Sequence, residues 1–173
     1  MKHIKLLSMM FLLGVLFVAC KEQPKDQEWS KFSGYTTEDI AGTYAFSNIA
    51  DAFDGLIESQ YCHICEDARI TVTASSANII QFEVNCPGAG FHKLFEGRPW
   101  TYDDDYIINI GGTSSNTHPE YGLTAYVYEN EQGEVRLHGY AQYIEWVVII
   151  DSYGQEEYKI KSKTNYYFDV IKN

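Results

Sequence analysis

Three cysteines and two histidines lie close together in the middle of the chain, and these residue types form disulfides, metal sites or redox pairs. The motif Cys62-His63-Ile64-Cys65 is followed by Cys86 and His92. Thiolate and imidazole ligands suit zinc, and a Cys-x-x-Cys pair has zinc-site spacing, but Cys86 and His92 do not repeat it. A redox Cys-x-x-Cys needs a helix start to lower the thiol pKa, whereas strand-forming residues follow here.

A disulfide from Cys86 to Cys65 or to Cys62 is the interpretation that the spacing favours. If Ser76-Ala77 is the tip of a hairpin, residues whose numbers sum to 153 face each other, so Cys86 faces Asp67 and Cys65 is two positions beyond. A small shift at the strand ends brings those two cysteines within bridging range. The alternative is a set of buried free thiols. No cofactor is expected.

Other polar groups give weaker signals for chemistry. Three aspartates at 103–105 lack the alternating spacing and glycine of a calcium loop, so a solvated turn is favoured. A ladder of Lys159, Lys161 and Lys163 is typical of an exposed strand that resists pairing, with an anion site as the alternative. No nucleophile elbow or phosphate loop is present in the sequence. The sequence therefore favours a binding or structural protein over an enzyme.

Aromatic side chains are abundant, with 14 Tyr and 3 Trp. Tyrosine favours strands and offers both an apolar ring and a polar hydroxyl. In a β protein these rings either pack in the core or line a ligand cavity. The candidate ligand-binding residues are Trp100, Tyr126, Tyr140, Trp146 and Tyr166.

The N-terminus has the layout of an export signal. Lys2 and Lys5 are followed by an apolar run at 6–19, which is too short for a permanent membrane helix, and Ala19 precedes Cys20. A small residue followed by cysteine resembles the lipobox of bacterial lipoproteins. The resemblance implies that residues 1–19 are a signal peptide, that Cys20 is acylated, and that the protein is anchored to the outer membrane in the cell envelope, facing the periplasm or the surface. In such an oxidising compartment a disulfide is expected.

Residues 20–35 then read as the lipidated cysteine and a flexible tether, because this stretch is polar and has no periodicity. The whole chain has a formal charge of −11, and removal of two lysines with the signal leaves 11 − 24 = −13. Such an acidic domain disfavours nucleic acid and anionic lipid headgroups as partners. Contact with the membrane is therefore expected through the acyl chains alone.

Residues 36–173 read as one all-β domain. About eight strands joined by short turns predict an antiparallel meander that closes into an up-and-down β-barrel, with a two-sheet β-sandwich as the alternative. The apolar run at 146–150 is expected to be buried on both faces. In the last strand, Tyr158, Ile160, Tyr166 and Phe168 share one parity and are expected on one face.

The first strand of this domain carries Gly42-Thr43-Tyr44, which resembles the Gly-x-Trp element that opens lipocalins. Residues 49–60 have helical spacing and match the position of the lid loop that follows. The resemblance implies a lipocalin-like, or calycin-like, barrel that binds a small apolar or amphipathic ligand. The alternative is a non-catalytic interaction or structural module that docks onto an envelope protein or a glycan.

Overall fold

The computed structural model describes residues 28–47, 53, 56, 58–75, 79–97, 106–111 and 120–173. Within them the chain is all-β, as predicted, and forms one sheet of ten strands. The strands are β1 (Trp29–Lys31), β2 (Gly42–Phe46), β3 (Cys62–Ile64), β4 (Arg69–Ser75), β5 (Ile79–Cys86), β6 (Phe91–Gly97), β7 (Ile107–Gly111), β8 (Tyr121–Asn130), β9 (Val135–Ile150) and β10 (Glu156–Lys172). A short helix, α2 (Thr37–Ile40), precedes β2, and a 3-10 turn, η1 (Pro87–Ala89), precedes β6.

The strand order is β1-β8-β9-β10-β2-β4-β5-β6, with β7 paired to β8 and β3 paired to β10. All pairs are antiparallel except β3 with β10. Within the described residues the sheet is not closed by hydrogen bonds. β6 and β7 nevertheless lie close to each other, since a Cβ added to Gly97 of β6 would be 3.0 Å from Ile110 Cγ2 of β7.

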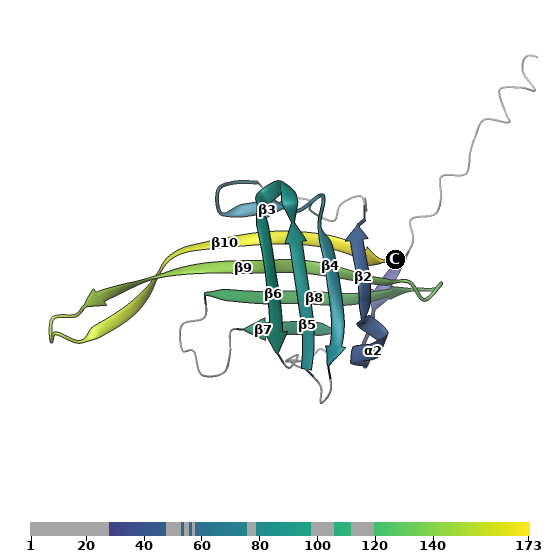
Figure 1. Cartoon of the computed structure of the whole chain (residues 1–173), viewed down its shortest axis with the longest axis horizontal. Coiled ribbons are helices and arrows are strands. Elements are labelled where there is room, and N and C mark those ends of the chain that lie inside the picture. The colour runs from purple at the N-terminus through teal and green to yellow at the C-terminus, as the bar shows by residue number, and fades with distance from the viewer. Residues whose placement is uncertain are drawn as a thin grey trace, which may run out of the picture.

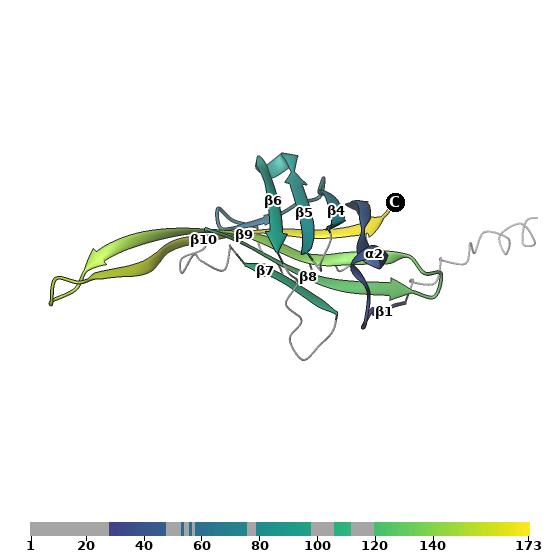
Figure 2. The ribbon, with the colours of Figure 1, turned by 60° about the horizontal axis from the view of Figure 1, so that its bottom comes forward.

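The sheet folds over into two layers, with β2, β4, β5 and β6 crossing over β8, β9 and β10 (Figures 1 and 2). This crossing resembles orthogonal sheet packing. The space between the layers is filled, because Tyr44, Phe82 and Phe168 are fully buried there. At one end, Tyr44 Oη donates to Ile40 O of α2 over 2.6 Å.

One glycine in this core allows β8 and β9 to pack closely. A Cβ on Gly139 would lie 2.1 Å from Thr124 O and 2.9 Å from Ala125 Cα. No side chain fits there without moving the β8 backbone, so the position requires glycine. The small residues at 125, 139 and 141 are compatible with an open interior, but each has one large buried residue as a cross-strand neighbour, namely Ile108, Phe168 and Leu123 respectively.

Beyond the body, β9 and β10 continue as a two-stranded arm, residues 145–161, which projects away from every other strand (Figure 1). The arm begins at a bulge. Ile160 pairs with Trp146 and Ser162 pairs with Glu145, so Lys161 is an extra residue on β10. A bulge bends and twists the ribbon at that point.

Because of the bulge, the side chains of the last strand do not all face as predicted. Because one residue is inserted, Tyr158 and Ile160 lie on the face opposite Tyr166 and Phe168, although their numbers share one parity. The apolar run at 146–150 was expected to be buried on both faces, and this is wrong. It forms one strand of the arm, where Val147, Val148 and Ile150 are exposed.

Two further expectations differ from the structure. β1 pairs with β8, so the folded body begins within the segment expected to be the tether. In the β4–β5 hairpin Arg69 faces Asn85, one residue away from the expected register, in which it would face Val84.

Cys20, Trp100 and most of residues 49–60 lie outside the described residues, as does the aspartate run at 103–105. No helix in the described part of the chain is long and apolar enough to cross a membrane.

Candidate functional site

The arm has one apolar face. Directly opposed residues on two paired strands share a face, so Trp146 and Ile160 lie beside Val148 and Tyr158. We call this set, together with Ile150, the arm face. Its exposed members are Val148 (46%), Ile150 (64%), Tyr158 (43%) and Ile160 (53%).

The opposite face of the arm, which we call the polar face, carries charged side chains beside Val147 and Ile149. Lys159 pairs with Glu157 at 3.4 Å, and Lys161 Nζ pairs with Glu145 Oε1 at 2.6 Å. Ser162 Oγ also donates to Glu145 over 3.0 Å. The hydrogen bond from Lys161 holds the pKa of the Glu145 carboxyl below its usual value. The polar face therefore has two ion pairs, whereas the rows of Trp146 and Val148 on the arm face have no charged side chain.

The tip of the arm is a hydrogen-bonded turn. Asp151 Oδ1 accepts from the backbone N–H groups of Tyr153 and Gln155, each over 2.8 Å, and Gly154 has a φ of 78°, which favours glycine. This turn holds Tyr153 outward with 88% of its surface exposed. The apolar surface of the arm thus extends to its end.

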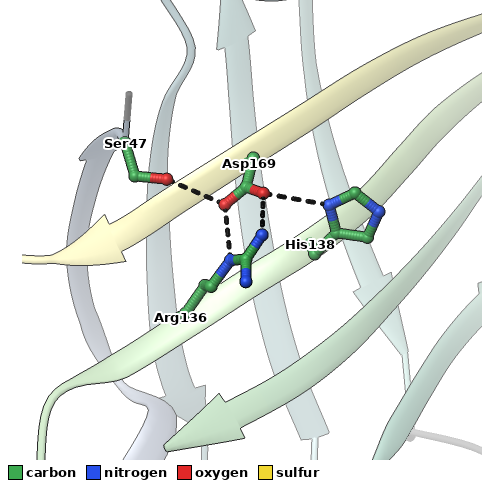
Figure 3. Close-up of polar contacts among 4 residues, drawn as sticks. All are labelled: Ser47, Arg136, His138 and Asp169. Atoms are coloured by element: carbon green, nitrogen blue, oxygen red, sulfur yellow. Dashed lines mark hydrogen bonds and ion pairs between the residues drawn. The ribbon is translucent and has the colours of Figure 1, made fainter. Parts of the chain in front are cut away.

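A second feature lies on the outer face of the body, where Asp169 of β10 is fully buried (Figure 3). Its carboxylate accepts from Arg136 Nε over 2.8 Å and from Ser47 Oγ over 2.8 Å, and pairs with Arg136 Nη2. His138 Nδ1 lies 3.1 Å from Asp169 Oδ2. Burial by itself raises the pKa of Asp169, but the bonds from Arg136, His138 and Ser47 outweigh it and hold the pKa at about 2.

This cluster has a serine, a histidine and an aspartate but not the arrangement of a catalytic triad. Ser47 donates to the aspartate rather than to the histidine, and a carboxylate with a pKa of about 2 is too weak a base to activate the hydroxyl. Arg136 is held further by the rings of Trp29 and Tyr128, each 5.7 Å from its guanidinium carbon. The cluster therefore joins β9 and β10 to the residue after β2 and has a structural role.

The cysteines form the expected bridge. Cys65 and Cys86 are disulfide-bonded, with their Cα atoms 5.4 Å apart, and Cys62 is a free thiol. Burial, and then the negative charge of Glu58, raises the pKa of Cys62, which makes it a poor nucleophile. The alternative zinc set of Cys62, Cys65, Cys86 and His92 is wrong, because two of its sulfurs are bonded to each other. His92 Nε2 instead lies 2.8 Å from Glu83 Oε1.

The aromatic residues proposed as ligand contacts do not come together. Tyr126 packs near Tyr106 on the outer side of the body, with ring centroids 5.9 Å apart. Tyr140 packs 5.4 Å from Tyr167 on the same side. Trp146 belongs to the arm face. Of the predicted set within the described residues, only Tyr166 faces the interior.

Tyr166 belongs to a half-buried aromatic cluster at the end of the core nearest the arm. Its ring stacks on Phe91 at 4.0 Å and on His63 at 5.3 Å. Burial raises its pKa, and the nearby Tyr121 and Tyr143, 5.2 Å from each other, raise it further. Lys93 Nζ lies 3.7 Å from the centre of the Tyr121 ring. We call this set the aromatic cluster.

A hollow of about 460 Å³ lies over the outer face of β4, β5 and β6. Its lining comprises Thr71, Thr73, Gln81, Glu83, His92, Lys93 and Leu94. In the described residues no group of three or more histidine, cysteine, aspartate or glutamate side chains is placed to hold a metal ion. This hollow therefore offers hydrogen-bonding groups but no metal centre.

The sequence reasoning did not identify the arm face. The available signal was two long strand patterns around a short turn, Ser152-Tyr153-Gly154, with more residues than the body's other strands have.

Comparison with known protein families, with curated proteins and with solved structures finds no match.

Proposed function

We propose that this chain is a lipid-anchored protein of the cell envelope, acylated at Cys20, that acts as a non-catalytic interaction module and docks through the arm face. The anchor and the outer-membrane location rest on the lipobox resemblance at residues 1–20. Docking rests on one structural observation, the exposed apolar face of the arm.

The size of the arm face supports this function. The four exposed side chains present roughly 400 Å² of largely apolar surface, at the scale of the largest patch on a typical monomer, which is often functional. Burying that area gains about 10 kcal/mol before the cost of association is subtracted. A two-stranded ribbon is also only marginally stable by itself, so a partner that covers the arm stabilises it.

The position of the arm supports the same function. β1, the first described strand, pairs with the end of β8 next to the β8–β9 turn, and the arm lies at the other end of β9 (Figure 2). β9 has 16 residues, so the arm tip is about 50 Å from that turn. A chain anchored at Cys20 therefore carries its contact surface at the end of the molecule farthest from the tether.

Binding of a small apolar ligand is the second candidate function. The observation in its favour is the aromatic cluster, because half-buried rings beside a cation suit an amphipathic ligand with an acidic group. In this proposal the body is a lipocalin-like barrel left open between β6 and β7, with a two-sheet sandwich as the alternative. A thermal-shift screen with fatty acids and steroids tests it, and a Lys93→Met variant should lose any response to acidic ligands.

Photo-crosslinking in cells that produce the full chain tests the docking function. A photoreactive residue is placed at Val148 on the arm face or at Val147 on the polar face. Both positions hold valine, adjoin each other and are exposed. We expect discrete adducts from position 148 and few from position 147. Equal yields from both positions would show that the arm face is not a specific contact.

A further inference from the structure

Opposite charges flank the arm face, with Lys163 just beyond the base of the arm and Glu156 near its tip. On this side of the ribbon each residue of β9 and its directly opposed residue of β10 form a row, and there are four rows. The first row, at the base, is Ile144 with Lys163, and the last row, near the tip, is Ile150 with Glu156. The two rows between them are apolar. Lys163 and Glu156 are both exposed.

These two charges differ from the charges on the polar face of the arm. Lys159 and Lys161 pair with Glu157 and Glu145 on the polar face. Lys163 and Glu156 take part in no ion pair within the described residues. The side of the arm that is apolar thus also has one unpaired charge of each sign, separated by the length of the strip.

We propose that the arm face binds the arm face of a second copy of this chain, with the two arms antiparallel across a twofold axis. This inference rests on the proposed docking function and names its partner. The axis passes between the Trp146 row and the Val148 row. The Trp146 row of one copy then meets the Val148 row of the second copy, and each Lys163 meets the Glu156 of the other copy.

The arrangement is self-complementary in the order of its apolar rows and its charges. A twofold contact uses the same patch twice, so the patch must present the complement of each of its own features. Reversing the strip end to end exchanges Lys163 with Glu156 and maps the apolar rows onto each other. A bilayer surface has no matching order of charges, and the acidic chain is repelled by anionic headgroups.

The area predicts a weak dimer. The arm face offers roughly 400 Å² per copy, about half of the 800 Å² per partner that a standard stable interface buries. Association in solution is therefore expected at micromolar concentration. Two chains held on one membrane meet at a much higher effective concentration, which favours the pair there.

Charge reversal in the full chain, extracted in detergent, tests the pairing by sedimentation equilibrium in a density-matched buffer. Lys163→Glu or Glu156→Lys alone should weaken self-association about tenfold, because symmetry turns two attractive contacts into two repulsive ones. The double variant should restore self-association to within about threefold of the parent. Lys159→Glu, the same charge change on the polar face, should leave it unchanged.

A parent chain that stays monomeric across the accessible concentrations would overturn the pairing, as would a double variant no better than the single ones. The two proposals remain distinguishable. A monomeric chain whose position 148 still crosslinks one different protein in cells would refute the pairing and support docking. A monomeric chain with no crosslinks at position 148 would refute both.

Discussion

The buried carboxylate of Asp169 should make the fold sensitive to acid. Its pKa is about 2 in the folded chain against an ordinary 3.8, a difference that corresponds to roughly 2 kcal/mol. Because the folded pKa is the lower one, this stability is present above pH ~4 and is lost as the pH falls towards 2. By the same relation, about half of it is lost at pH ~3.

The variant Asp169→Asn isolates this contribution. At pH 7 it leaves the Arg136 guanidinium, which is 13% exposed, without its carboxylate, and this should cost about 3–5 kcal/mol. The amide does not titrate, so the difference in free energy of unfolding between parent and variant should narrow by about 1 kcal/mol between pH 7 and pH 3. Urea unfolding at both pH values, monitored by tryptophan fluorescence, measures this difference.

A matched control is Glu145→Gln, which removes a carboxylate that is also paired but whose side chain is 41% exposed, compared with 0% for Asp169. Its effect should be small at both pH values because exposed ion pairs contribute little. If the parent and Asp169→Asn lose stability in parallel as the pH falls, another group causes the acid sensitivity. The structural role assigned to the Asp169 cluster would then be wrong.

Three further changes test other parts of the structure. Cys86→Ser opens a loop closed across 21 residues and should lower the free energy of unfolding by about 3 kcal/mol, whereas Cys62→Ser should change it little; urea unfolding decides. Gly139→Ala should cost about 3 kcal/mol or more by thermal unfolding because its Cβ would overlap β8, while Gly111→Ala, where a Cβ meets nothing within 4 Å, should not. Cys20→Ala should move the protein from the membrane fraction to the soluble fraction; retention after a salt wash would contradict the lipid anchor.

The alternation of apolar residues predicted the all-β fold because each strand of the body buries one face. Ile80, Phe82 and Val84 show this pattern and are fully buried. Hairpin spacing predicted a bridge from Cys86 to Cys65 or Cys62, and Cys65 is the partner, although the register differed by one residue. Such a shift is small at a strand end, where the disulfide lies, and two cysteines tolerate it.

The arm could not be predicted from the same alternation. A continuous apolar run indicates burial on both faces only if a second layer covers it, and the sequence does not show where the layers end. The bulge at Lys161 was hidden for a related reason, because an inserted residue changes the facing of a strand without changing its composition. The Asp169 cluster joins residues 122 positions apart, which no local pattern connects.

Thiol labelling measures most directly whether the arm face is covered in the membrane. Val148→Cys and Val147→Cys are each made in a Cys62→Ser background, and their rates of reaction with a maleimide are compared in dilute detergent extract and in intact membranes. In the extract we expect similar rates, because both positions are exposed. In membranes we expect at least tenfold slower labelling at position 148 alone. Equal rates at the two positions in membranes would contradict the claim that the arm face is a contact surface.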